Sequence, residues 1–241
     1  MLRTIDLTNP LTHNTPIYPS DPPFIAIPHA THARDGYSLH RLSLGTHTGT
    51  HLDAPFHFDS KGTKVGDLPL GKLVGKVWVV DLEDMNLTER ERVDWETFAS
   101  KLPTQDELSL RDTILLINTS WSSRYYYGDT RTYFSHPYLS PSIANHLLAL
   151  GISVVGVDTP SPDETPREDG SCEGANGFGF HETFLGNGGV IVENLANLKE
   201  LSLVLKTEIP SRWMVSLAPL KLEGLDGSPV RAFAFCVPYD E

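Results

Sequence analysis

The chain has 241 residues, a formal net charge of −12, and 39% hydrophobic and 21% charged residues. These proportions are ordinary for a globular protein, and we expect a single domain over residues 1–241. The negative charge argues against nucleic acids and anionic membranes as partners, because both would repel the surface.

Targeting and redox signals are weak. No apolar run approaches the roughly 20 residues that a transmembrane helix needs. The first residues, MLRTIDLTNP, lack the apolar stretch of a secretory signal. Cys172 and Cys236 are too few for a disulfide framework. We therefore expect a reduced, cytoplasmic setting.

The N-terminal part begins with a short apolar alternation over Thr4–Thr8, which predicts a strand. The segment TPIYPSDPP, residues 15–23, contains four prolines. Proline cannot donate to a β-ladder, so we expect an extended surface segment outside the central sheet. Leu42 and Leu44 then alternate with polar residues and predict a short strand.

A histidine-rich motif follows over residues 45–58, with the sequence GTHTGTHLDAPFHF. It places His47, His51, Asp53 and His57 within eleven residues. Polar groups at this density are costly to bury unless each finds a partner, and a divalent metal would serve several at once. A single histidine here would be interpreted as a surface residue, but the spacing of the four favours a metal site.

The motif does not fit a helix, because its glycines and β-branched threonines disfavour one. In a straight strand His47 and His51 would lie roughly 13 Å apart, too far to share one zinc ion at about 2.0–2.1 Å from each nitrogen. Gly49 permits the chain to curl, and Pro55 turns His57 back toward the same place. We predict a strand that ends in a tight metal-binding loop.

The middle of the chain alternates between strand and helix patterns. Apolar runs predict buried strands, and amphipathic or capped segments predict helices. The strands are expected at Gly75–Leu82, Asp112–Asn118 and Ile152–Val157, and the helices at Val93–Leu102 and Ser140–Gly151. The last strand, helix and strand of this series indicate a β-α-β unit with parallel sheet.

Two long polar connections interrupt this pattern, over residues 121–136 and 160–179. Loops of this length are commonly functional lids or disordered segments. The first is rich in aromatic residues that could line a pocket for a planar substrate or form a dimer contact: Trp121, Tyr125, Tyr126, Tyr127, Tyr133 and Phe134.

The C-terminal third contains a further short strand, Val190–Glu193, and alternating strands within Arg212–Val237. His181-Glu182 does not continue into the zinc motif HExxH, because the fifth residue is Leu185. On its own, Glu193 would be interpreted as a solvated strand end.

Several segments resemble one family. The motif GTHTGTHLDAPFHF resembles the HxGTHxDxPxHF signature of the cyclase family of metal-dependent hydrolases, which includes bacterial kynurenine formamidase and isatin hydrolase. Residues 157–163, VDTPSPD, resemble the family stretch GIDTxSxD, and the context of His181 and Glu193 is also similar. The extended segment around Tyr18 resembles a family PxWPGDxP segment.

The resemblance implies an α/β fold with a mixed sheet and flanking helices, of the swivelling β/β/α type. It implies one or two divalent ions, Zn²⁺ or alternatively Mn²⁺, and a homodimer or higher homo-oligomer. The implied ligands are His47, His51, Asp53, His181 and Glu193. His57 would be the catalytic acid/base, Tyr18 would contact the substrate, and Asp158 and Asp163 would support the site.

The implied activity is hydrolysis of a C–N bond, in an amide, aryl-formamide or lactam, within a small aromatic molecule. An isatin-type lactam or lactone hydrolase and a cyclase or dehydratase of secondary metabolism are the alternatives. A metal-binding scaffold without activity is the non-enzymatic alternative. No nucleophile elbow, phosphate-binding loop or dinucleotide fingerprint competes with these interpretations.

Overall fold

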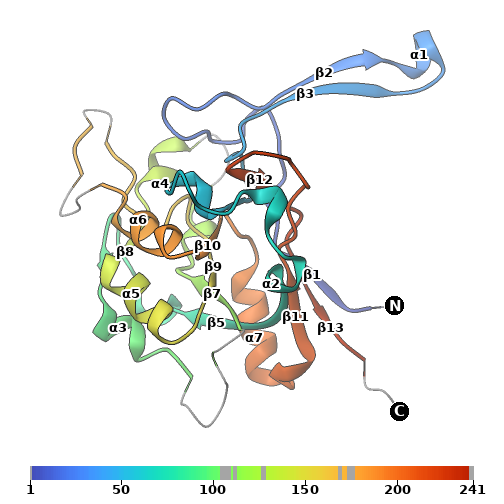
Figure 1. The fold of residues 1–241 in the computed structure, drawn as a ribbon. Helices are drawn as coiled ribbons and strands as arrows, with labels where there is room; N and C mark the ends of the chain where they lie inside the picture. The colour runs from blue at the N-terminus through green and yellow to red at the C-terminus, as the bar shows by residue number, and fades with distance from the viewer. Residues whose placement is uncertain are drawn as a thin grey trace.

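A nine-stranded mixed sheet organises the chain, in the order β1-β13-β11-β5-β7-β9-β10-β4-β12 (Figure 1). The computed structural model describes residues 2–103, 110, 113–125, 129–167, 170–172 and 177–238. The strands are β1 (Thr4–Asp6), β4 (His51–Asp53), β5 (Val74–Asp81), β7 (Ile114–Asn118), β9 (Val154–Val157), β10 (Val190–Glu193), β11 (Trp213–Ser216), β12 (Gly227–Pro229) and β13 (Phe233–Cys236). The central four, β5, β7, β9 and β10, are parallel, and the flanking strands pair antiparallel.

The parallel strands are apolar because helices cover both of their faces. Successive residues of β7 belong to different cores: Ile114 and Leu116 to one, Leu115 and Ile117 to the other. The helices α3 (Trp95–Ala99), α5 (Pro141–Ala149) and α6 (Gly179–Gly186) pack on one side, and α7 (Leu198–Thr207) packs against β5 and β7 on the other. The expected mixed sheet with flanking helices is confirmed.

The predicted β-α-β unit is present as β7, α5 and β9, with β7 and β9 parallel. The helix α7 was absent from the prediction. Three of its leucines recur at helical spacing and are buried, Leu198, Leu201 and Leu205, whereas Leu203 on the opposite side is exposed. This spacing is the sequence signal that marks it.

The strand predicted before the histidine motif exists, but it does not join the main sheet. β3 (Leu39–Ser43) pairs with β2 (Ile25–Ala30) in a two-stranded arm that projects from the body (Figure 1). The short helix α1 (His32–Asp35) lies at its tip. We call residues 25–43 the arm.

The remaining elements are short. β6 (Arg92–Val93) and β8 (Tyr138–Leu139) form a second two-stranded sheet, and α2 (Leu70–Leu73) and α4 (Thr130–Phe134) lie in connections. No helix in the described part of the chain has the length and apolar character needed to cross a membrane.

His136 is a fully buried histidine that ties two connections together. Its Nδ1 donates to the carbonyl of Pro137 (2.8 Å), and its Nε2 accepts from the hydroxyl of Thr165 (2.8 Å). This arrangement uses both nitrogens of a neutral ring. Burial lowers the pKa of His136 to about 4, and the Arg90 guanidinium also lowers it, against the opposing effect of Glu193 and Asp163.

We expect His136 to make the fold acid-sensitive. The unfolded chain takes up a proton on this ring near pH 6.5, whereas the folded chain does so only near pH 4. Stability is therefore complete above pH 6.5 and falls as the pH drops toward 4, by up to about 1.4 kcal/mol per pH unit.

The test is urea denaturation of His136→Gln between pH 8 and pH 4.5. The variant is expected to be less stable than the unmodified protein at pH 8, with the difference shrinking below pH 6.5. The exposed His146 supplies the control variant His146→Gln, against which the pH dependence of His136→Gln is compared. A constant penalty for His136→Gln would contradict the assignment.

Candidate metal centre

The histidine motif curls at Gly49, as its sequence predicts, with φ of +67°. The direction of the curl differs from the prediction in one respect. The loop comes first, and His51 and Asp53 then lie on strand β4 instead of in the loop. Alternate residues of a strand share a face, so the two side chains point the same way.

A neighbouring strand and a neighbouring helix bring two further residues of the site to this face. β4 lies between β10 and β12, and its antiparallel pairing with β10 places His51 opposite Glu193. His181 lies on helix α6, next to β10. The sheet therefore unites three segments that are far apart in sequence.

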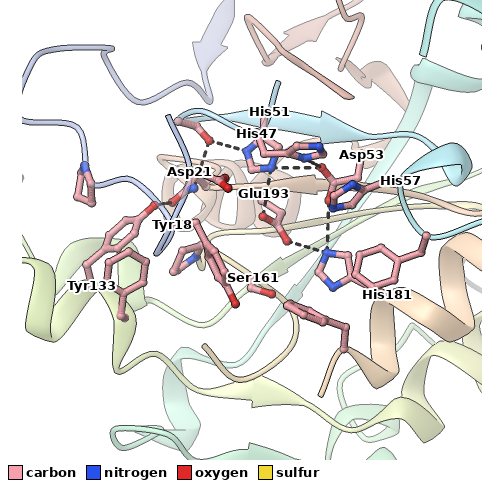
Figure 2. Close-up of a pocket in the computed structure, with 17 residues that line it drawn as sticks. Tyr18, Asp21, His47, His51, Asp53, His57, Tyr133, Ser161, His181 and Glu193 are labelled. Carbon is pink, nitrogen blue, oxygen red and sulfur yellow. Dashed lines mark hydrogen bonds and ion pairs between the residues drawn. The ribbon is translucent and has the colours of Figure 1, made fainter. Parts of the chain in front are cut away.

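The side chains converge at short distances (Figure 2). His51 Nε2 lies 3.2 Å from Asp53 Oδ1 and 3.2 Å from Glu193 Oε2. His181 Nε2 lies 3.4 Å from Asp53 Oδ2 and 3.2 Å from Glu193 Oε1. Each carboxylate thus presents one oxygen to each histidine, and all four side chains are buried.

The outer nitrogens of both rings are already committed. His51 Nδ1 donates to the Gly49 carbonyl (2.8 Å), and His181 Nδ1 donates to Asp163 Oδ2 (2.7 Å). In a neutral ring the inward Nε2 then carries a lone pair, which repels a carboxylate oxygen. A proton or a metal ion between them supplies the missing attraction.

Two buried oxygens support a metal ion in this place. Asp53 Oδ2 and Glu193 Oε1 accept no hydrogen bond from the described residues, although His181 lies nearby. Orphaned buried carboxylate oxygens are costly without a cation. The side chains of Asp53, His181 and Glu193 lie close enough to hold one ion, and His47, His51 and Asp53 form a second such group.

The same geometry perturbs the ionisation of the cluster. Burial would lower the pKa of His51, but the Asp53 and Glu193 carboxylates raise it well above its usual range. Burial would raise the pKa of Asp53, but the imidazoles of His51 and His47 hold it well below its usual range. The site favours positive charge at its centre.

His47 and His57 lie at the rim of the cluster. His47 Nδ1 is 2.7 Å from Asp53 Oδ1, and the two histidine rings stack at 4.0 Å between centroids. His57 contributes no atom to the inner group of Asp53, His181 and Glu193. Its side chain is 29% exposed, and burial lowers its pKa.

A pocket of about 260 Å³ opens onto the cluster. Its walls are aromatic, and Tyr18 lies edge-on to Phe134 at 6.3 Å between ring centroids. The hydroxyl of Tyr18 is buried and accepts or donates no hydrogen bond among the described residues. The other aromatic lining residues are Phe58, Tyr133 and Phe178.

The aromatic residues of the connection 121–136 have different roles. Tyr133 and Phe134 line the pocket, as expected if these aromatic residues line a pocket for a planar substrate. Tyr125 packs edge-on against Tyr133 (4.9 Å), and Trp121 is buried. Tyr126 and Tyr127 lie outside the described residues.

Asp158 and Asp163, the two aspartates expected to support the site, have different roles. Asp163 accepts from the backbone N–H groups of Phe180 and His181 and from the His181 ring, so it fixes both the start of α6 and the orientation of that ring. Asp158 instead accepts from Thr119 and Ser122. It stabilises a turn away from the cluster.

One residue of this neighbourhood was missed from the sequence. Asp226 Oδ2 lies 2.9 Å from His47 Nε2 and 3.1 Å from His57 Nδ1. The local sequence LDGSP resembles an ordinary turn, so no pattern within it marks the aspartate.

Comparison with known proteins identifies the class. Residues 5–164 match the family model described as putative cyclase. The chain therefore belongs to the cyclase family, and the expectation of a family of hydrolases is confirmed.

Individual relatives span nearly the whole chain. Kynurenine formamidase from Geobacillus thermodenitrificans is 30% identical over 234 residues, which cover 95% of each chain. That from Bacillus cereus is 31% identical over 229 residues, again 95% of each.

Solved structures show the same fold. An isatin hydrolase bound to the product analogue thioisatinate superposes with a TM-score of 0.82 at 22% identity, covering 98% of this chain and 93% of its own. Isatin hydrolase A from Ralstonia solanacearum gives 0.81 at 24% identity, covering 98% and 92%. The expected fold class is confirmed.

Proposed function

We propose that this protein is a metal-dependent hydrolase that cleaves a C–N bond in a small aromatic molecule. The proposal rests on one observation. Two inward Nε2 atoms and two carboxylates with orphaned oxygens meet at one end of an aromatic pocket. That arrangement suits a cation and a planar substrate together.

The donor set suggests the metal. Three imidazoles and two carboxylates suit Zn²⁺, with Mn²⁺ as the alternative. We propose as ligands His47, His51, Asp53, His181 and Glu193. Asp53 and Glu193 each direct separate oxygens toward His51 and His181, so both carboxylates would contribute to holding one or two ions there. Such an ion lowers the pKa of bound water and polarises a carbonyl.

The chain itself supplies orientation and proton movement. His57 borders the pocket outside the innermost group, so its ring is free to pass a proton to the leaving nitrogen. The rings of Tyr18, Phe134 and Phe178 would hold an aromatic substrate by its faces and edges.

The relatives suggest the substrate class. The two curated relatives are kynurenine formamidases. One solved isatin hydrolase is bound to thioisatinate, and isatin hydrolase A from Labrenzia aggregata is bound to benzyl benzoate. We propose an aryl-formamide as the first candidate and an isatin-type lactam as the second. Cyclase or dehydratase activity and a scaffold role are the outcomes to exclude.

Hydrolysis is tested with N-formylkynurenine and isatin, using the zinc-loaded protein. Turnover is expected to stop with a chelator and to return with zinc. His57→Ala is expected to lower turnover by about 10²–10⁴-fold because the proton transfer is lost, with zinc content unchanged. His13→Ala, at an exposed position, is the control.

Full turnover by His57→Ala would remove this residue from the mechanism. Zinc binding without turnover on a broad amide, lactam and lactone panel would favour the scaffold.

Ligation is tested with Asp53→Asn. Zinc at 100 times its Kd is expected to stabilise the unmodified protein by about 2.7 kcal/mol, which raises Tm by about 5–11 °C for a chain of this size. The variant is expected to lose most of this shift and to bind less zinc by elemental analysis. Asp67→Asn changes an exposed aspartate and should behave as the unmodified protein. An unchanged zinc content in Asp53→Asn would overturn the ligand assignment.

We also propose that the protein self-associates through the arm. Isolated two-stranded hairpins are marginal in water, yet this one exposes Ile25, Ile27, Leu39 and Leu42. The arm carries two arginines and one aspartate, whereas the whole chain has a net charge of −12. A second copy therefore offers a surface of complementary charge.

Light scattering tests this association. The unmodified protein is expected at twice the monomer mass or more, and Leu42→Asp at the monomer mass. Leu203→Asp is the matched control, because Leu203 on α7 is 62% exposed and Leu42 is 58% exposed. A monomeric unmodified protein, or equal dissociation by the control, would contradict the proposal.

A further inference from the structure

Asp226 joins the two histidines at the rim of the cluster through one oxygen. Its Oδ2 lies 2.9 Å from His47 Nε2 and 3.1 Å from His57 Nδ1. We propose that Asp226 is a positioning residue that fixes the tautomer and orientation of His57. This inference rests on the proposed function for the role of His57, but its structural part does not.

The carboxylate determines which nitrogen of His57 carries the proton. An ionised carboxylate only accepts hydrogen bonds, so Nδ1 of His57 must donate. The neutral ring then carries its lone pair on Nε2, the nitrogen that makes no hydrogen bond to the described residues. A lone pair on a defined nitrogen is what proton acceptance requires.

Two ring contacts complete the restraint on His57. Its ring stacks on His47 with centroids 4.0 Å apart and planes inclined by 28°. Phe58 meets it edge-on at 4.8 Å and 85°. A face, an edge and one nitrogen are thus all held, which leaves the ring little freedom to rotate.

Asp226 itself stands behind the site. It is absent from the residues that line the pocket, so it acts on a substrate only through the histidines. Its backbone is held independently, since Ala54 N donates to Asp226 O (2.9 Å) and Val65 N donates to Leu225 O (2.9 Å). Thr46 Oγ1 donates to Oδ1 (3.1 Å), which leaves Oδ2 for the two rings.

The next residue, Gly227, provides room for this contact. A Cβ there would lie 2.7 Å from His47 Cε1 and 2.8 Å from the carbonyl oxygen of Leu52. Both distances are shorter than real Cβ atoms show. The Asp226-Gly227 pair therefore combines an acceptor with the space that the His47 ring occupies.

The same three side chains could instead hold an ion of their own, since His47, His57 and Asp226 lie within reach of a common point. We favour positioning for two reasons. The nitrogen-to-oxygen distances are ordinary hydrogen bonds, and the other nitrogen of His47 already faces Asp53. An ion held by His47, His57 and Asp226 is one of the outcomes that the kinetic measurement distinguishes.

The first measurement is histidine ¹⁵N NMR on the full chain, with and without zinc, with His57 assigned by its absence in His57→Ala. The unmodified protein is expected to show the Nδ1–H tautomer of His57. Asp226→Ala is expected to shift it toward the Nε2–H form. Glu223→Gln removes an exposed carboxylate from the same loop and should leave the tautomer unchanged. An unshifted tautomer in Asp226→Ala overturns the proposal.

The second measurement is kinetic and separates positioning from ligation. Asp226→Ala is expected to lower kcat by about 10–100-fold, the usual effect of removing a supporting partner, with KM and zinc stoichiometry nearly unchanged. Asp226→Glu is expected to recover part of the loss. Zinc loss in proportion to activity would show that Asp226 acts on the metal, as a ligand itself or through His47, and would overturn positioning of His57.

The two proposals fail separately. If the unmodified protein hydrolyses nothing, the proposed function fails, while the NMR result still decides the role of Asp226. If Asp226→Ala does not fold, Asp226→Leu takes its place, because its branched side chain is close to Asp in shape and offers no acceptor. An unchanged tautomer population in that variant counts against the proposal.

Discussion

The pairing of β4 with β10 is the constraint on which the site depends. It sets His51 opposite Glu193 and leaves Asp53 two residues along on the same face. Between them Leu52 points into the apolar core. A register slip of one residue would turn the polar pair into the core and the leucine outward. The burial of Leu52 therefore protects the geometry of the polar residues on either side of it.

The second constraint is that each imidazole is held from outside by a partner that fixes its inner nitrogen. The Gly49 carbonyl holds His51, and the Asp163 carboxylate holds His181. These partners come from a loop and from the connection before α6, not from the sheet. Rigid strands set the positions of the side chains, and loops set their tautomers. Such outer contacts typically decide how well a metal site is formed.

The sequence predicted a large part of this molecule. The spacing of the histidine motif gave the cluster and its bend at Gly49, and apolar runs gave β5, β7, β9 and β10. It could not show that β4 lies between two strands from the last quarter of the chain, because strand pairing is not a local property. It marked neither Asp226, whose neighbouring sequence LDGSP is typical of a turn, nor the exposure of the apolar arm. Alternation alone does not distinguish an arm from a core strand.

The position of β4 in the sheet also bears on how the molecule reaches its folded state. The strand is synthesised early, but both of its neighbours, β10 and β12, are synthesised late. Closing such long loops is slow and costs entropy before the contacts are gained. His51 therefore lies on a strand whose two edges stay unpaired until β10 and β12 have been synthesised. Local contacts such as the bend at Gly49 can form early. The full cluster forms only when β4 has paired with β10 in the correct register, because that pairing places His51 opposite Glu193.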